Sequence, residues 1–198
     1  MNKRLKSVCV FCGSANGRRA EYAEAAAAFG RLLAEREIRV VYGAGKVGLM
    51  GVLADAALAA GGNVIGVIPQ MLVDRELAHH GTDLRIVTSM HERKALMAEL
   101  ADAFVALPGG LGTYEELCEV LTWGQLGIHA KPLGCLNVAG YFEPLARMLD
   151  HAVEEGFLRS EQRELLVVES EMEALVRRLE ERIGERCGEW VGDVHGAS

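Results

Sequence analysis

The sequence predicts an α/β domain in which a doubly wound, Rossmann-like parallel sheet carries helices on both faces. Short apolar runs rich in β-branched residues alternate with longer amphipathic segments along the chain. The apolar runs are continuous rather than alternating, which is typical of strands that are buried on both faces of a parallel sheet. The chain has 198 residues, of which 50% are hydrophobic, and this is enough for one domain with a substantial core.

Seven strands follow from these runs. They are expected over residues 7–12 (SVCVFC), 38–43 (IRVVYG), 63–68 (NVIGVI), 84–88 (LRIVT), 103–107 (AFVAL), 133–138 (LGCLNV) and 164–169 (ELLVVE). Helices are expected between them over residues 21–37, 49–60 and 141–156, and strands linked by helices pair in parallel. No Pro/Ser-rich linker divides the chain. We therefore predict a single domain over residues 1–184 and a flexible tail over residues 185–198.

Composition excludes several classes of partner. The formal net charge is -7 and no dense basic run occurs, so a nucleic-acid polymer is an unfavoured partner. No apolar run approaches the roughly 18 residues of a membrane span, and the N-terminus has no signal-like cleavage site. The five cysteines are odd in number and scattered, which makes a poor disulfide framework. We expect a cytoplasmic protein that does not bind membranes.

Three glycine-rich loops follow predicted strands. They are residues 12–19 (CGSANGRR), 42–51 (YGAGKVGLMG) and 106–117 (ALPGGLGTYEEL). In doubly wound folds, ligands bind where the carboxyl ends of strands turn into helices. Glycines let the backbone approach a ligand closely, and free N–H groups at a helix start attract an anion. The three loops together predict a phosphate or nucleotide site.

The second loop does not fit a dinucleotide or P-loop site. Residues 43–48 (GAGKVG) formally match G-x-G-x-x-G, but Pro69 and Gln70 stand where the ribose-binding acidic residue belongs. Lys46 is not followed by Ser or Thr, as a P-loop requires. Both NAD and ATP are therefore disfavoured as ligands.

The third loop leaves two interpretations open. Pro108 ends a strand, the glycines that follow allow a tight fold against a phosphate, and Thr113 is placed at the N-cap of the next helix. Thr113 and Glu116 have the spacing of a capping box, in which Glu116 only completes the helix start. Alternatively, Glu115 and Glu116 face the sugar of a bound nucleotide, where a carboxylate binds hydroxyls or activates water.

Residues 108–116 (PGGLGTYEE) resemble the PGGxGTxxE signature of the Lonely Guy family, cytokinin-activating phosphoribohydrolases often mislabelled as lysine decarboxylases. The resemblance covers about residues 7–183 and includes FCGS (11–14), GLMG (48–51), MHERK (90–94) and TWGQLGIHAKP (122–132). It implies cleavage of the N-glycosidic bond of N6-modified adenosine 5'-monophosphates and of AMP, which releases the base and ribose 5-phosphate. It also implies a homodimer, for which the apolar stretch with Trp123, Leu126 and Ile128 is a candidate contact.

The resemblance assigns roles residue by residue. Arg93 and Glu116 match the family's catalytic pair. The resemblance and the glycine loops together predict the residues that bind substrate: Ser14, Gly45, Glu76, Lys94, Gly109, Gly110, Leu111, Gly112, Thr113, Glu115 and Thr122. Two positions depart from the family: Ala44 replaces the middle one of three common glycines, and Ser89 replaces a frequent aspartate.

The chemistry agrees with this set. N-glycosidic cleavage passes through an oxocarbenium-like sugar, which a carboxylate such as Glu116 stabilises while it orients water. Arg93 either holds Glu116 or clamps the phosphate. No metal or cofactor is expected, since the histidines are dispersed and Cys9 and Cys12 are expected on opposite faces of one strand. The alternatives are a non-catalytic nucleotide-binding protein and a molybdenum-cofactor-carrier-like protein, the latter disfavoured by the MHERK segment.

Overall fold

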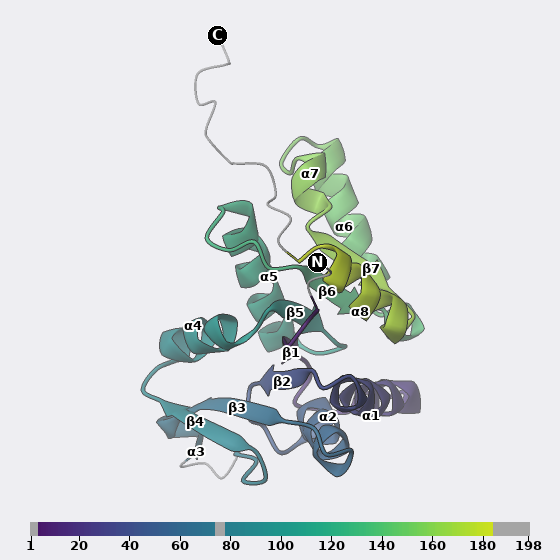
Figure 1. Cartoon of the computed structure of the whole chain (residues 1–198). Helices are drawn as coiled ribbons and strands as arrows, with labels where there is room; N and C mark the ends of the chain where they lie inside the picture. Colours follow the sequence, from purple (N-terminus) through teal and green to yellow (C-terminus); the bar gives the residue numbers. More distant parts are fainter. Residues whose placement is uncertain (1–3, 74–77, 184–198) are drawn as a thin grey trace.

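The computed structural model describes residues 4–73 and 78–183. Its strands form one parallel sheet in the order β4-β3-β2-β1-β5-β6-β7. The strands are β1 (Ser7–Phe11), β2 (Arg39–Tyr42), β3 (Val64–Pro69), β4 (Asp83–Val87), β5 (Ala103–Ala106), β6 (Leu133–Leu136) and β7 (Leu166–Glu169). The prediction of a doubly wound parallel sheet is confirmed (Figure 1).

Helices connect the strands, as the alternating sequence pattern predicts. They are α1 (Ala20–Glu35), α2 (Gly48–Ala59), α3 (Gln70–Val73), α4 (Met90–Leu100), α5 (Leu111–Gln125), α6 (Glu143–Glu154), α7 (Ser160–Arg163) and α8 (Met172–Glu181), with a 3-10 turn, η1 (Val138–Gly140), before α6. Within the described residues, no helix is long and apolar enough to cross a membrane.

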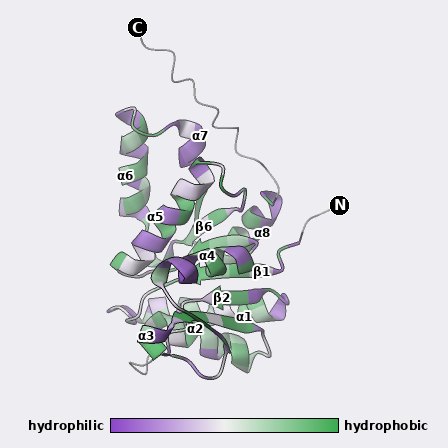
Figure 2. Cartoon of the chain, turned by 90° about the vertical axis from the view of Figure 1, so that its left-hand side faces the viewer, coloured by the Kyte–Doolittle hydropathy of each residue, from purple (hydrophilic) through white to green (hydrophobic). Residues whose placement is uncertain are grey.

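Two hydrophobic cores cover the two faces of the sheet. Successive residues of β1 alternate between them, so Val8 and Val10 pack under α1, α2 and α8, whereas Cys9 and Phe11 pack under α4, α5 and α6. Cys9 and Cys12 lie in different cores, as expected for thiols on opposite faces. Figure 2 shows the central strands in green, the colour of hydrophobic residues. Burial on both faces explains why these strands are apolar throughout.

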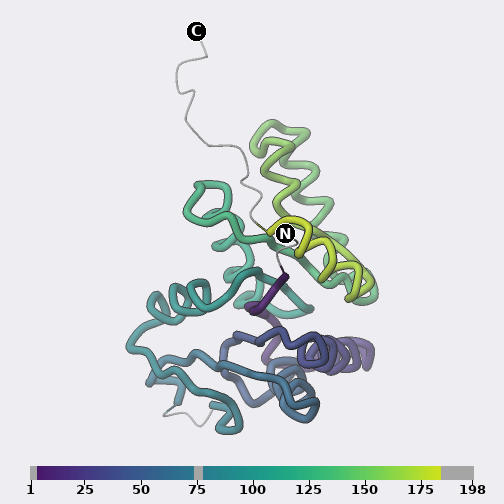
Figure 3. Tube along the Cα trace, in the orientation of Figure 1, coloured from purple at the N-terminus to yellow at the C-terminus, as the bar shows by residue number. Residues whose placement is uncertain are grey.

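The sheet reverses its winding direction between β1 and β5. The chain passes outward from β1 through β4 and then returns to place β5 on the other side of β1. Figure 3 shows this division, with the chain up to α4 on one side of β1 and the later segments on the other. The loops after the two strands meet, because the Gly13 N–H donates to the Pro108 carbonyl at 3.0 Å. This switch point is where doubly wound folds bind their ligands.

Two predicted helix starts are wrong. Helix α5 begins at Leu111 with Gly110 as its N-cap, so Thr113 lies inside the first turn and forms no capping box with Glu116. The first turn of a helix lacks intrahelical acceptors for its N–H groups, and glycine costs little there. Helix α6 begins at Glu143 rather than at residue 141, because residues 141 and 142 form a turn after η1 and Phe142 is the N-cap. The predicted tail, residues 185–198, lies outside the described residues.

Candidate active site

The three glycine-rich loops converge at the carboxyl end of β1. The Met50 N–H at the start of α2 donates to the Gly13 carbonyl at 3.3 Å. Gly48 has a left-handed backbone with φ of 62°. A Cβ on Gly48 would lie 2.2 Å from the carbonyl carbon of Ser14, so only glycine fits at this crossing. The first and second loops are therefore locked together beside the third.

The loop of residues 108–113 presents the start of α5. The carbonyls of Pro108, Gly109 and Gly110 accept hydrogen bonds from the Gly13 N–H, the Tyr141 hydroxyl and the Tyr114 N–H, respectively. No side chain of the described residues caps this helix start. The N–H groups of its first turn have no intrahelical acceptor, and the helix dipole favours a negative charge beside them. The loop is suited to an anion such as a phosphate.

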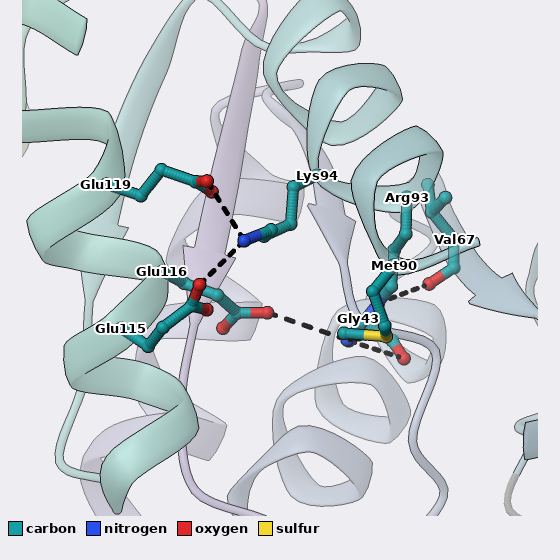
Figure 4. Close-up of polar contacts among 8 residues, drawn as sticks. All are labelled: Gly43, Val67, Met90, Arg93, Lys94, Glu115, Glu116 and Glu119. Carbon is teal, nitrogen blue, oxygen red and sulfur yellow. Dashed lines mark hydrogen bonds and ion pairs between the residues drawn. The ribbon is translucent and has the colours of Figure 1, made fainter.

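Arg93 lies in the first turn of α4 and is buried, with 9% of its surface exposed. Its Nε donates to the Val67 carbonyl at 3.1 Å and its Nη2 to the Gly43 carbonyl at 3.3 Å. A Cβ on Gly43 would lie 2.0 Å from Nη2, so this glycine makes room for the guanidinium. The two carbonyls direct the remaining nitrogen, Nη1, toward α5 (Figure 4).

Glu116 of α5 faces Arg93. Its Oε1 lies 3.7 Å from Arg93 Nη1, and the two side chains are only 13% and 10% exposed. Burial raises the pKa of Glu116 above its ordinary value, while the charge of Arg93 acts in the opposite direction. The pair is a nearly buried carboxylate held by a fixed cation. Of the two roles left open for Arg93, the geometry agrees with holding Glu116.

Lys94 binds two other acidic residues of α5. Its Nζ lies 2.6 Å from Glu115 Oε1 and 2.9 Å from Glu119 Oε1 (Figure 4). The hydrogen bond that Lys94 donates to Glu115 is the main cause that raises the pKa of Lys94. Lys94 and Glu115, both predicted to bind substrate, are thus paired with each other. They join α4 to α5 beside the Arg93–Glu116 pair.

The other predicted site residues lie partly at the surface, around a cavity and the start of α5, and partly in the buried interior. Ser14 is exposed and lines a cavity of about 200 Å³ together with Gly109, Gly110 and the rings of Tyr22 and Tyr141. Gly45 is buried and forms a bridge with Ala78. Leu111 and Gly112 are exposed in the first turn of α5, and Thr113 is buried beneath Gly109.

One predicted residue of the described chain, Thr122, is not joined to this group. Thr122 lies six residues beyond Glu116, which is about 9 Å along the helix, and its hydroxyl donates to the Cys118 carbonyl. Glu76 lies outside the described residues. The rings of Tyr114 and Tyr141 were not predicted as part of the site, because Tyr114 stands at a variable position of the signature and Tyr141 lies outside the motifs.

The two departures from the family pattern have local explanations. Ala44 adopts a left-handed backbone with φ of 58° and is fully buried, so the loop keeps a glycine-like conformation. Ser89 is the N-cap of α4, and its hydroxyl accepts a hydrogen bond from the Glu92 N–H at 3.1 Å. Serine caps a helix about as well as aspartate. In the described part of the chain, no three His, Cys, Asp or Glu side chains are placed to hold a metal ion.

The fold and the site define a doubly wound α/β protein with a glycine-rich loop at the switch point of its sheet and a nearly buried Arg–Glu pair. The family model described as "Possible lysine decarboxylase" matches residues 50–179. A cytokinin riboside 5'-monophosphate phosphoribohydrolase of Oryza sativa subsp. japonica is 50% identical over 91% of this chain and 75% of its own length. One of Arabidopsis thaliana is 51% identical over 90% of this chain and 82% of its own length. The chain belongs to the Lonely Guy family, as the sequence motifs predict.

Solved structures with the same fold are more distant in sequence. The molybdenum cofactor carrier protein of Chlamydomonas reinhardtii superposes with a TM-score of 0.68 at 18% identity, over 92% of this chain and all of its own. The molybdenum cofactor binding protein of Rippkaea orientalis gives a TM-score of 0.67 at 19% identity, over 90% of this chain and 97% of its own. At this identity the likeness concerns the fold alone.

Proposed function

We propose that this protein is a phosphoribohydrolase that cleaves the N-glycosidic bond of N6-modified adenosine 5'-monophosphates. The products are the free base and ribose 5-phosphate, and we propose AMP as a second substrate. The observation that supports this most is the buried Arg93–Glu116 pair, which lies beside the 108–113 loop at the switch point of the sheet. The half-identical relatives named as phosphoribohydrolases support the same reaction.

In this proposal the 108–113 loop binds the 5'-phosphate. The first-turn N–H groups of α5 and the positive end of its dipole face the anion. Lys94 offsets part of the negative charge of Glu115 and Glu119, which reduces their repulsion of a phosphate. Substrate binding energy then comes largely from the phosphate, and the reacting sugar is placed near Glu116.

Glu116 acts on the sugar. As the bond between C1' and the base nitrogen breaks, positive charge develops on the ring, and a carboxylate in a water-poor site stabilises it. Water adds to C1', its hydroxyl remains on the ribose, and its proton passes to the departing base. Burial raises the pKa of Glu116, and the adjacent Arg93 counteracts this effect and favours the ionised form that the step requires.

The reaction proposed here uses water and these side chains, and it assigns no role to a metal or cofactor. A non-catalytic nucleotide-binding protein would need the glycine loop but not a buried, charged pair beside it. Such a pair is costly to bury, since each ion loses its hydration. This cost favours the enzyme over a binding protein.

Product analysis tests the proposal. The purified protein is incubated with isopentenyladenosine 5'-monophosphate or with AMP, and the products are separated by chromatography. We expect the free base and ribose 5-phosphate in equal amounts. Release of inorganic phosphate with the riboside left intact would instead make the protein a phosphatase, and an unchanged substrate would leave the binding-protein alternative.

A further inference from the structure

Two tyrosines lie against the 108–113 loop: Tyr114, at a variable position of the signature, and Tyr141, outside the family motifs given above. The hydroxyl of Tyr141 donates a hydrogen bond to the Gly109 carbonyl. The hydroxyl of Tyr114 donates to that of Tyr141 at 3.0 Å, and the two rings lie parallel with centroids 6.4 Å apart. The ring of Tyr22 meets Tyr141 edge-on at 5.7 Å. Tyr141 is thus enclosed by aromatic rings while its hydroxyl faces the loop.

The position of Tyr141 is fixed by the segment between β6 and α6. The neighbouring Phe142 is fully buried, and its N–H donates to Asn137 Oδ1 at 2.8 Å. Asn137 is in turn bound to β7, since its N–H donates to the Glu169 carbonyl at 2.7 Å. Tyr141 lies 32 residues beyond Gly109 in the chain and therefore joins the loop after β5 to the segment that is hydrogen-bonded to β7 at the sheet edge.

The hydrogen bond to Gly109 sets the direction of an N–H group. In a trans peptide, the carbonyl of one residue and the N–H of the next point in opposite directions. A Gly109 carbonyl that points to Tyr141 therefore turns the Gly110 N–H away from Tyr141. The Pro108 carbonyl accepts from the Gly13 N–H and the Gly110 carbonyl accepts from the Tyr114 N–H. Of these three peptides, the one between Gly109 and Gly110 is therefore held by a side chain, that of Tyr141.

We infer that Tyr141 is a positioning residue for phosphate binding: its hydroxyl orients the Gly109–Gly110 peptide so that the Gly110 N–H faces the 5'-phosphate, and Tyr114 supports that hydroxyl. This inference rests on the proposed function and extends it to the chemistry of the phosphate site. Glycine at both positions makes the peptide free to rotate without such a restraint. Burial raises the pKa of Tyr114 to about 12, so its phenol remains a donor at neutral and moderately alkaline pH.

The test compares Tyr141→Phe with Tyr114→Phe, both of which keep the aromatic ring. One hydrogen bond contributes about 1 kcal/mol, which corresponds to roughly a fivefold change in binding. For Tyr141→Phe we expect the Kd of ribose 5-phosphate and the KM of AMP to rise by about fivefold or more, with kcat within about twofold of wild type. The inhibition constant of adenosine, which has no phosphate, should stay unchanged. Tyr114→Phe should weaken ribose 5-phosphate binding by less than Tyr141→Phe does.

Two results would overturn the inference. One is wild-type affinity of folded Tyr141→Phe for ribose 5-phosphate, and the other is an equal loss of affinity for adenosine and ribose 5-phosphate, which indicates a general structural role. The titration with ribose 5-phosphate does not depend on turnover. If wild type binds it but hydrolyses no nucleotide, and Tyr141→Phe binds it more weakly, the proposed function fails and the inference holds. If wild type does not bind it, both fail.

Discussion

Replacing Gly43 by alanine should displace Arg93 without unfolding the protein. The added Cβ would lie 2.0 Å from Arg93 Nη2, whereas a relaxed contact needs about 3.5 Å, so the guanidinium must move by about 1.5 Å. The backbone of Gly43 is not left-handed and tolerates alanine. The hydrogen bond from Arg93 Nε to Val67 can persist, while the bond to the Gly43 carbonyl and the 3.7 Å approach to Glu116 are lost.

A misplacement of about 1 Å in an active site can cost roughly a hundredfold in rate, or about 2.7 kcal/mol in the barrier. We expect kcat/KM of Gly43→Ala for AMP to fall by at least this factor. The loss of the hydrogen bond from the charged guanidinium and of its approach to Glu116 should lower the free energy of unfolding by about 3 kcal/mol or less. Steady-state kinetics and denaturant unfolding of the same preparation measure both quantities. A variant with more than about a third of wild-type kcat/KM would refute the reasoning that Arg93 must occupy this position.

Three further predictions concern the substrate, the assembly and the pH dependence. Because the 108–113 loop is suited to an anion, AMP should be cleaved and adenosine scarcely touched; comparable turnover of both, measured by chromatography, would contradict this. Leu126 and Ile128 are 47% and 65% exposed at the end of α5, and with the family resemblance they lead us to predict a homodimer; light scattering at micromolar concentration checks this, and a monomeric mass would refute it. Burial raises the pKa of Glu116 above 4.5, its value in the unfolded chain. Between the unfolded and folded pKa values the folded protein holds a proton that the unfolded chain releases, so the stability of the protein falls as pH rises through this range. Glu116→Gln removes this fall. Its stability relative to wild type, from denaturant unfolding, should therefore increase from pH 4.5 toward neutral pH, and a difference that is independent of pH would count against a raised pKa.

The sheet could be predicted because its central strands are buried on both faces. Continuous apolar runs such as residues 7–12 are typical of strands in a parallel sheet, and the helices between them favour parallel pairing. The glycine loops could be predicted to converge for the same reason, since the carboxyl ends of parallel strands lie at one edge of the sheet. The contact between Gly48 and Ser14 shows how closely the first two loops approach each other.

Other features of the site depend on tertiary contacts that leave no local pattern. The start of α5 was misplaced because glycine and threonine favour loops and caps, whereas in the fold Gly110 is the cap and Thr113 packs beneath Gly109. The sequence left the role of Arg93 open, because its partners Val67, Gly43 and Glu116 lie on three different elements. The contact of Tyr141 with Gly109 has no motif and could be found only in the structure.

The most direct test of the central claim is the turnover of Glu116→Gln with AMP. Glutamine keeps the shape of the side chain and removes its charge, and Glu116 caps no helix in this fold. If the carboxylate stabilises an oxocarbenium-like sugar, kcat should fall by roughly a hundredfold or more while the variant remains folded and binds ribose 5-phosphate about as tightly as wild type. Near wild-type turnover by a folded Glu116→Gln protein would contradict the catalytic role of Glu116.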